Sequence, residues 1–298
     1  MARQDAKEQT RVSGGRAGDG GAPGFHLHRT LGVRTELWRQ LTRRRTQITI
    51  GFLVLLPFLL VLAFTVGNSS NSGGGSGGFV DRATMSGLNF TVFSLFVSIG
   101  FLLIVVVALF FGDAIASEAS WSSLRYLLAI PVPRGRLLRQ KAVVAGLLSL
   151  LALVTLPAVA LALGTAVYGT AGMSTPFGDV LPFGTALVRL LLAVLYIAVS
   201  LLWVAGLAAL LSVSTDAPLG AVGGAVMATI LSEILDGIPA LEGLRDWLPT
   251  HYAYAWTGLL SADIDWSRMA WGAFSAVAYA TVLGALALAR FTSKDITS

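Results

Sequence analysis

The chain has 298 residues, of which 55% are hydrophobic and only 12% are charged. Soluble domains carry about 25% charged residues, and several apolar runs here reach the roughly 20 residues that cross a bilayer, so a soluble globular protein is excluded. The formal net charge is +5, and the absence of cysteine excludes disulfides, thiol catalysis and thiolate metal sites. The composition therefore predicts a multi-span membrane protein.

The N-terminal part divides into two segments. Residues 1–25 are polar, glycine-rich and mixed in charge, and we expect a disordered cytoplasmic tail. Residues 26–45 place leucines and Trp38 on one side of a helical wheel and charged side chains on the other, which predicts an amphipathic helix in the plane of the lipid headgroups. Arg34 falls within the apolar stripe, so its guanidinium would have to extend toward water. The alternative is a plain polar lead-in to the first span.

Residues 46–290 contain six apolar runs and form the predicted membrane domain. The expected spans are about 48–66, 90–111, 143–167, 186–213, 219–235 and 269–288. Their central parts contain no Asp, Glu, Lys, Arg or His, and charges inside a membrane usually mark ion or proton pathways. This argues against an ion-coupled carrier and a selective ion pore, and favours a lipid-like, amphipathic or drug-like passenger. Asp113 and Glu118 follow the second span, where we expect both to reach water.

An elbow at residues 113–141 is the longest polar interruption between spans. It is strongly basic, with Arg125, Arg134, Arg136, Arg139 and Lys141. Pro131 and Pro133 disfavour helix before them, which predicts a short surface helix over 122–130, a rigid corner and a new helix after it. The alternative is an ordinary basic loop.

Two later features concern packing and the outer surface. Gly220 and Gly224 form a GxxxG pattern in the fifth span, which permits close approach between helices. Residues 236–268 are rich in Trp, Tyr and Pro, and we expect two short helices at the outer interface. Either could re-enter the bilayer where protein covers its backbone.

The distribution of basic residues predicts the orientation. Of 21 Lys and Arg residues, ten precede the first span, five lie in the elbow and two, Arg290 and Lys294, follow the last span. Short cytoplasmic loops carry the excess of Lys and Arg. We therefore expect a multi-pass protein of the plasma or inner membrane, with the elbow and both termini cytoplasmic, including a tail at residues 291–298.

Catalytic motifs are missing from the sequence. It has no GxxxxGK[ST], HExxH or GxSxG pattern, and no run of His with carboxylates suited to a metal. We expect a chain that is not an enzyme, and binds neither a nucleotide nor a metal cofactor. An intramembrane enzyme would need a paired acid, a nucleophile or a metal set that this chain lacks.

The elbow carries a family resemblance. Its order of Glu118, Ser122-Ser123-Leu124, Leu127-Leu128, Pro131, Arg134, Leu137-Leu138 and Lys141 resembles the signature of ABC-2-type permeases, the membrane subunits of type-2 ABC exporters. The six-span, all-α plan is also similar, over about residues 26–298. Trp121-Ser122 departs from the pattern, because the family often has a glycine-containing step there.

The resemblance implies partners and site residues. It implies a dimer with an identical or paralogous second permease in membrane lipid, docked on separate ATP-binding cassette ATPase subunits that bind ATP and Mg. No nucleic acid partner is expected. The elbow would be the coupling helix, with contacts from Glu118, Leu124, Arg125, Leu127, Leu128, Pro131, Arg134 and Lys141.

The implied function is export of a lipid, drug or peptide, driven by ATP that the separate ATPase subunit hydrolyses. The alternative is a membrane-bound accessory or assembly subunit of an ABC-type complex that is not a simple exporter.

Overall fold

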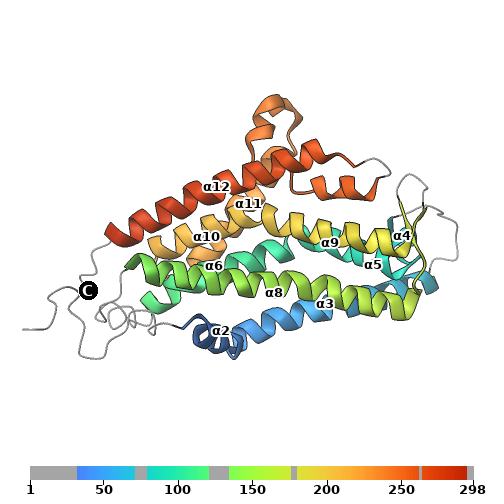
Figure 1. Ribbon diagram of the computed structural model, residues 1–298, viewed down its shortest axis with the longest axis horizontal. Coiled ribbons are helices and arrows are strands. Elements are labelled where there is room, and N and C mark those ends of the chain that lie inside the picture. The colour runs from blue at the N-terminus through green and yellow to red at the C-terminus, as the bar shows by residue number, and fades with distance from the viewer. Residues whose placement is uncertain (1–31, 71–78, 121–133, 176–179, 262–263, 294–298) are drawn as a thin grey trace, which may run out of the picture.

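The computed structural model describes residues 32–70, 79–120, 134–175, 180–261 and 264–293 as a bundle of long helices (Figure 1). Five helical segments are long and apolar enough to cross a membrane, or six when a bent pair is counted as one span. They are α3 (Arg44–Ser70), α5 (Gly87–Ile99) with α6 (Leu102–Ser120), α8 (Arg134–Tyr168), α9 (Phe183–Ser200) with α10 (Leu202–Ser214), α11 (Pro218–Asp236) and α12 (Trp266–Ser293). The prediction of an all-α membrane protein is confirmed.

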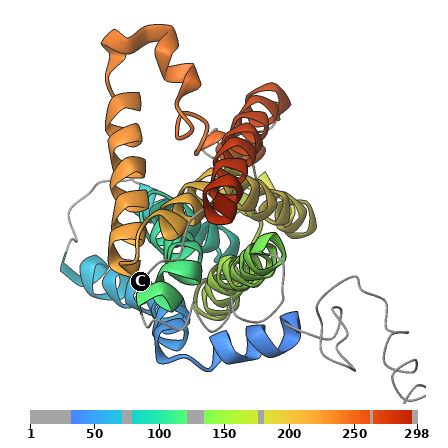
Figure 2. The ribbon, with the colours of Figure 1, turned by 90° about the vertical axis from the view of Figure 1, so that its left-hand side faces the viewer.

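A short helix, α2 (Val33–Leu41), precedes the first span. Figure 2 looks along the bundle and shows α2 at its lower edge, running across the direction of the long helices. We call the end of the bundle where α3 and α8 begin, and where α6 and α12 end, the basic end (Figure 1). Leu37 and Leu41 pack against the core, whereas Trp38 is 70% exposed. The helix predicted over residues 26–45 is thus interrupted after Leu41, residues 26–31 lie outside the described part of the chain, and the placement at a lipid interface stays a prediction.

The second span is bent rather than continuous. α5 and α6 meet at an angle of 55°, whereas the hydropathy pattern predicted one helix over 90–111. On α5, the Ser94 and Ser98 hydroxyls donate to the carbonyl oxygens four residues earlier, at 2.9 and 2.6 Å, a bond that bends helices. At Gly100 a Cβ atom would lie 2.8 Å from the Tyr254 hydroxyl, so a side chain there would displace Tyr254.

The described connections at the opposite end include one short helix and one pair of strands. α4 (Phe79–Ala83) precedes α5, and β1 (Met173–Ser174) pairs antiparallel with β2 (Val180–Leu181). The Asn89 amide binds this pair, because its Nδ2 donates to Ser174 O at 3.1 Å and its Oδ1 accepts from Ser174 N at 3.0 Å. These four residues form the strands of the described chain, whose other regular elements are helices.

The segment between α11 and α12 forms two short 3-10 helices, η2 (Pro239–Trp247) and η3 (Ala255–Leu260). This agrees with the two short helices expected from the sequence. In Figure 2, α11 runs across the view and carries η2 out to one side of the bundle. By contrast, η3 packs against α9, and Trp256 in η3 is fully buried.

Candidate functional site

The elbow residues fall partly within the described chain. Leu124, Arg125, Leu127, Leu128 and Pro131 lie outside the described residues, and so does the predicted surface helix. Arg134 is the first residue of α8, and its side chain is not described. Glu118 in the last turn of α6 and Lys141 near the start of α8 are both described.

Glu118 and Lys141 form an ion pair at the basic end. Lys141 Nζ donates to Glu118 Oε1, although the two residues are 23 positions apart in the chain. The side chains are only 5% and 7% exposed. The pair therefore joins α6 to α8 at the two ends of the elbow.

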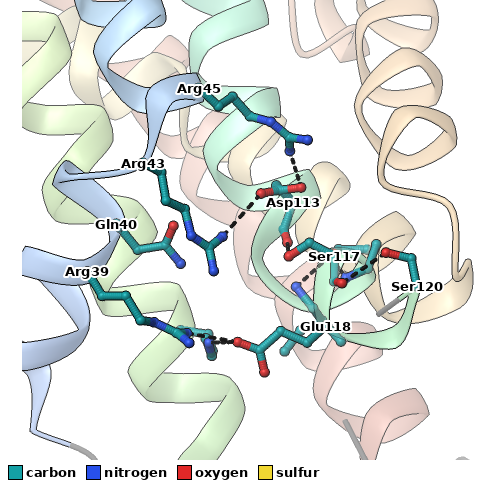
Figure 3. Close-up of polar contacts among 12 residues, drawn as sticks. Arg39, Gln40, Arg43, Arg45, Asp113, Ser117, Glu118 and Ser120 are labelled. Carbon is teal, nitrogen blue, oxygen red and sulfur yellow. Dashed lines mark hydrogen bonds and ion pairs between the residues drawn. The ribbon is translucent and has the colours of Figure 1, made fainter. Parts of the chain in front are cut away.

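Helix α2 adds two more charges to this pair. Lys141 Nζ also donates to Glu36 Oε1 at 2.9 Å. Arg39 Nη2 donates to Glu36 Oε1 at 2.7 Å. The same nitrogen donates to Glu118 Oε1 at 3.0 Å (Figure 3). The negative charges of two acids thus balance the positive charges of two bases. We call these four residues the Glu118 network: Glu36, Arg39, Glu118 and Lys141.

A second group of charges ties the start of α3 to α6. The Arg45 guanidinium donates to Asp113 Oδ1, and Arg43 Nη1 lies 3.7 Å from Asp113 Oδ2 (Figure 3). Asp113 is one turn before Ser117, whose hydroxyl donates to the Asp113 carbonyl oxygen at 2.7 Å. Together with the Glu118 network, this group fixes α2 and the start of α3 against α6 and α8.

The expectation that Asp113 and Glu118 reach water is wrong. They are 9% and 6% exposed, because α2 and the first residues of α3 cover the end of α6 and supply arginines to it. Sequence reasoning had placed Glu36 and Arg39 on the polar face of the lead-in helix without a partner. One signal in the sequence could have indicated these partners. Several arginines precede the first span, and two carboxylates follow the second span at the same predicted side of the membrane.

The Glu36 carboxyl has a lowered pKa. Burial alone would raise the pKa, but hydrogen bonds and positive charge from Arg39 and Lys141 outweigh it and lower the pKa from 4.5 to about 2. The carboxylate is therefore ionised across the physiological range.

This pKa predicts how stability depends on pH. Because the folded-state pKa lies below the unfolded value, the contribution of Glu36 is complete above pH 4.5 and is lost as the pH falls toward 2. We expect the thermal unfolding midpoint of the detergent-purified protein to fall less steeply below pH 4.5 in Glu36→Gln than in the unchanged chain. The exposed-acid control Glu242→Gln should keep the original slope; an unchanged slope in Glu36→Gln would contradict the network.

Within the described chain, Gly220 and Gly224 do not approach the backbone of another helix closely. A Cβ at Gly220 would have ordinary contacts at 3.7 Å and beyond, and one at Gly224 would meet the end of the Leu211 side chain at 3.1 Å. Among the described glycines of the spans, the closest approach to the backbone of another span occurs instead at Gly87 on α5, beside Gly164 on α8. The proposed role of Gly220 and Gly224 in helix packing stays a prediction.

Metal chemistry finds no support in the described residues. Across residues 32–70, 79–120, 134–175, 180–261 and 264–293, no three His, Asp or Glu side chains gather as a metal site.

The comparison with protein families agrees with the elbow resemblance. A model of the ABC-2 family transporter protein matches residues 33–231, which is more than half of the chain and runs from α2 into α11. No curated protein matches the chain. The matched segment includes the complete Glu118 network and both spans that the elbow joins. The chain therefore belongs to the ABC-2 family of transporter proteins, as a multi-pass permease component of an ABC transporter, a class whose members work with an ATP-binding cassette ATPase.

Proposed function

We propose that this chain is the permease subunit of an exporter that moves an amphipathic or hydrophobic compound with energy from ATP. A separate ATPase subunit would bind ATP and Mg and hydrolyse the nucleotide. A second permease, identical or paralogous, would complete the membrane part. The observation that carries the proposal is the buried ion pair between Glu118 and Lys141, one at each end of the elbow.

The pair makes the elbow a suitable place for a motor to act. Because α6 and α8 are joined at the point where each meets the elbow, a push on residues 121–133 would displace both helices together. Glu36 and Arg39 would transmit the same displacement to α2. If the ends of α6 and α8 were not joined, the same push would mainly bend the elbow and would move the two helices less.

The displacement has a direct route into the bundle. The Ser212 hydroxyl of α10 accepts from the backbone N–H groups of Ile115 and Ala116 on α6, at 3.0 and 3.1 Å. Gly112 lies one turn earlier, and a Cβ there would approach Val222 of α11 to 2.9 Å. The last turns of α6 are therefore in direct contact with both α10 and α11.

The described membrane interior supports an uncharged pathway. Arg189 on α9 lies close to the start of that helix, and its Nη1 donates to the carbonyl oxygens of Leu259 and Ser261 at 3.0 and 2.6 Å. This guanidinium holds η3 in place and is not available to an ion in transit. Energy for transport would then come from the ATPase rather than from an ion gradient.

The orientation belongs to the same proposal. Of the two ends of the bundle, the basic end would face the cytoplasm, with both termini and the elbow on that side. The ATPase would then meet the elbow where ATP is available.

Elbow variants test the coupling role. We expect Leu127→Asp and Arg134→Glu each to lower the ratio of compound transported to ATP hydrolysed by about tenfold or more, because about 1.4 kcal/mol of lost coupling contact has that effect. The measurement is transport and ATPase activity of the reconstituted complex in liposomes. Arg290→Glu, a charge reversal on α12 at the same end, should leave the ratio unchanged. Normal ratios in both elbow variants would rule out this coupling contact.

A further inference from the structure

An aromatic groove lies between η2 and α12, outside the segment that the family model matches. Its volume of about 570 Å³ lies in the range of small-molecule sites. Five aromatic side chains and one carboxylate line it: Trp247, Tyr252, Trp271, Phe274, Tyr279 and Asp246. We call this the η2–α12 groove.

The walls of the groove are fixed by hydrogen bonds. The Tyr279 hydroxyl donates to Trp247 O at 2.7 Å, which fastens η2 to α12. His251 Nδ1 lies 2.6 Å from Asp236 Oδ1, and Arg245 Nε lies 3.5 Å from the same oxygen, so the segment is also held to the end of α11. The groove is therefore preformed.

Tyr252 is held in the same way. A Cβ at Gly272 would lie 2.6 Å from the Tyr252 Cβ, so the glycine lets Tyr252 approach α12. The Tyr252 carbonyl oxygen accepts from the Tyr196 hydroxyl at 2.8 Å. The ring of His251 packs edge-on against Tyr252 at 4.7 Å between centroids.

The electrostatics of the groove favour a cation. Asp246 is the charged residue among the described lining residues, with its side chain 63% exposed and His251 Nε2 3.4 Å from its Oδ1. Residues 236–268 contain five Asp and Glu against two Arg, although the chain as a whole is basic. Aromatic faces attract organic cations as well.

We propose that the η2–α12 groove binds a free organic cation with an apolar body, such as a lipophilic phosphonium or quaternary ammonium compound. The aromatic rings would hold the apolar body and the cation, and Asp246 would balance its charge. A phospholipid fits less well, because the described lining contains no Lys or Arg to balance a phosphate. That this cation is the exported compound rests on the proposed function, whereas its binding does not.

Direct binding to the full chain in phosphatidylethanolamine nanodiscs tests the proposal. The probes are radiolabelled tetraphenylphosphonium and tetraphenylborate, which have the same shape and opposite charge, each corrected for empty nanodiscs. We expect saturable binding of the phosphonium only. Asp246→Asn and Trp271→Ala should each weaken it about three- to tenfold, the range for one cation–π or ion-pair contact.

Matched variants separate the groove from general surface effects. Trp271→Phe keeps an aromatic face and should retain most of the affinity. Glu242→Gln on η2 and Trp266→Ala on α12 lie outside the groove lining and should leave affinity unchanged. Equal binding of the borate, or equal loss in the controls, would overturn the proposal by showing an aromatic interfacial belt only.

Two further results have defined meanings. Loss of phosphonium binding in phosphatidylcholine nanodiscs would assign the groove to a lipid choline headgroup and overturn the free-cation proposal. Groove binding without ATP-driven phosphonium transport by the complete complex would leave the inference standing and count against the proposed exporter for this class of compound. ATP-driven export of another compound by a chain that does not bind the phosphonium would support the proposed exporter and overturn the inference about the groove.

Discussion

Replacing Lys141 with methionine should destabilise the folded chain by about 3–5 kcal/mol, the cost of removing one member of a buried ion pair. Lys141 Nζ contacts both Glu36 Oε1 and Glu118 Oε1. Without it, two largely buried carboxylates share Arg39 as the remaining cation of the Glu118 network. The expected result is a marked fall in the thermal unfolding midpoint of the detergent-purified protein.

A double variant distinguishes a lost ion pair from lost packing. Glu118→Met with Lys141→Met removes both charges of the pair, and replacing a whole buried pair by apolar side chains is often neutral. The double variant should recover much of the stability that Lys141→Met loses, because Glu36 keeps its bond to Arg39. Arg139→Met, an exposed change on the same helix, should shift stability by less than about 0.5 kcal/mol. A Lys141→Met protein as stable as that control would show that the network contributes little.

Replacing Gly87 with leucine should prevent close packing of α5 on α8 and cost more than about 3 kcal/mol, the upper end of overpacking effects. A Cβ at Gly87 would lie 2.4 Å from the Thr165 backbone nitrogen and 2.7 Å from the Gly164 carbonyl carbon. These are backbone atoms of a long helix and cannot rotate away as a side chain could.

The expected readout is a sharp loss of folded, monodisperse protein on detergent extraction. Gly284→Leu on α12 is the matched control, because a Cβ there meets nothing within 4 Å. The control should extract and unfold as the unchanged chain does. Equal yields and equal unfolding midpoints for the two leucine variants would mean that α5 and α8 do not meet as closely as described.

The positions of the helices could be predicted from the sequence because each span is a long apolar run. The bend between α5 and α6 could not be predicted in the same way, since mean hydropathy does not change across it. Its local signals were Ser94 and Ser98 followed by Gly100, and their meaning depends on the hydrogen bonds that the serines form and on Tyr254, which lies far away in sequence.

The candidate site was only partly predictable. Glu118 and Lys141 were named as coupling residues through the family resemblance, and the structure brings them together as an ion pair, while their coupling role stays a prediction. Glu36 and Arg39 were recognised only as polar positions, because nothing local indicates that α2 crosses the end of α6. Their partners become visible only when the tertiary arrangement is known.

Glycine spacing was the least informative signal. Within the described chain, the GxxxG pattern at Gly220 and Gly224 faces at most the end of the Leu211 side chain, whereas Gly87 and Gly164, which belong to no such motif, mark a contact between the backbones of two spans. Close approach depends on which helix lies opposite, and a pattern within one helix does not contain that information.

The bend at Gly100 divides the second span into two levers with different attachments. The half farther from the basic end, α5, packs along α8, whereas α6 packs on α8 and also on α10 and α11. A tilt imposed near Glu118 would therefore turn α6 about the bend beside Tyr254, and it would reach α5 mainly through α8. The contacts of α6 with α10 and α11 would change first, so movement at the basic end would rearrange one half of the bundle more than the other.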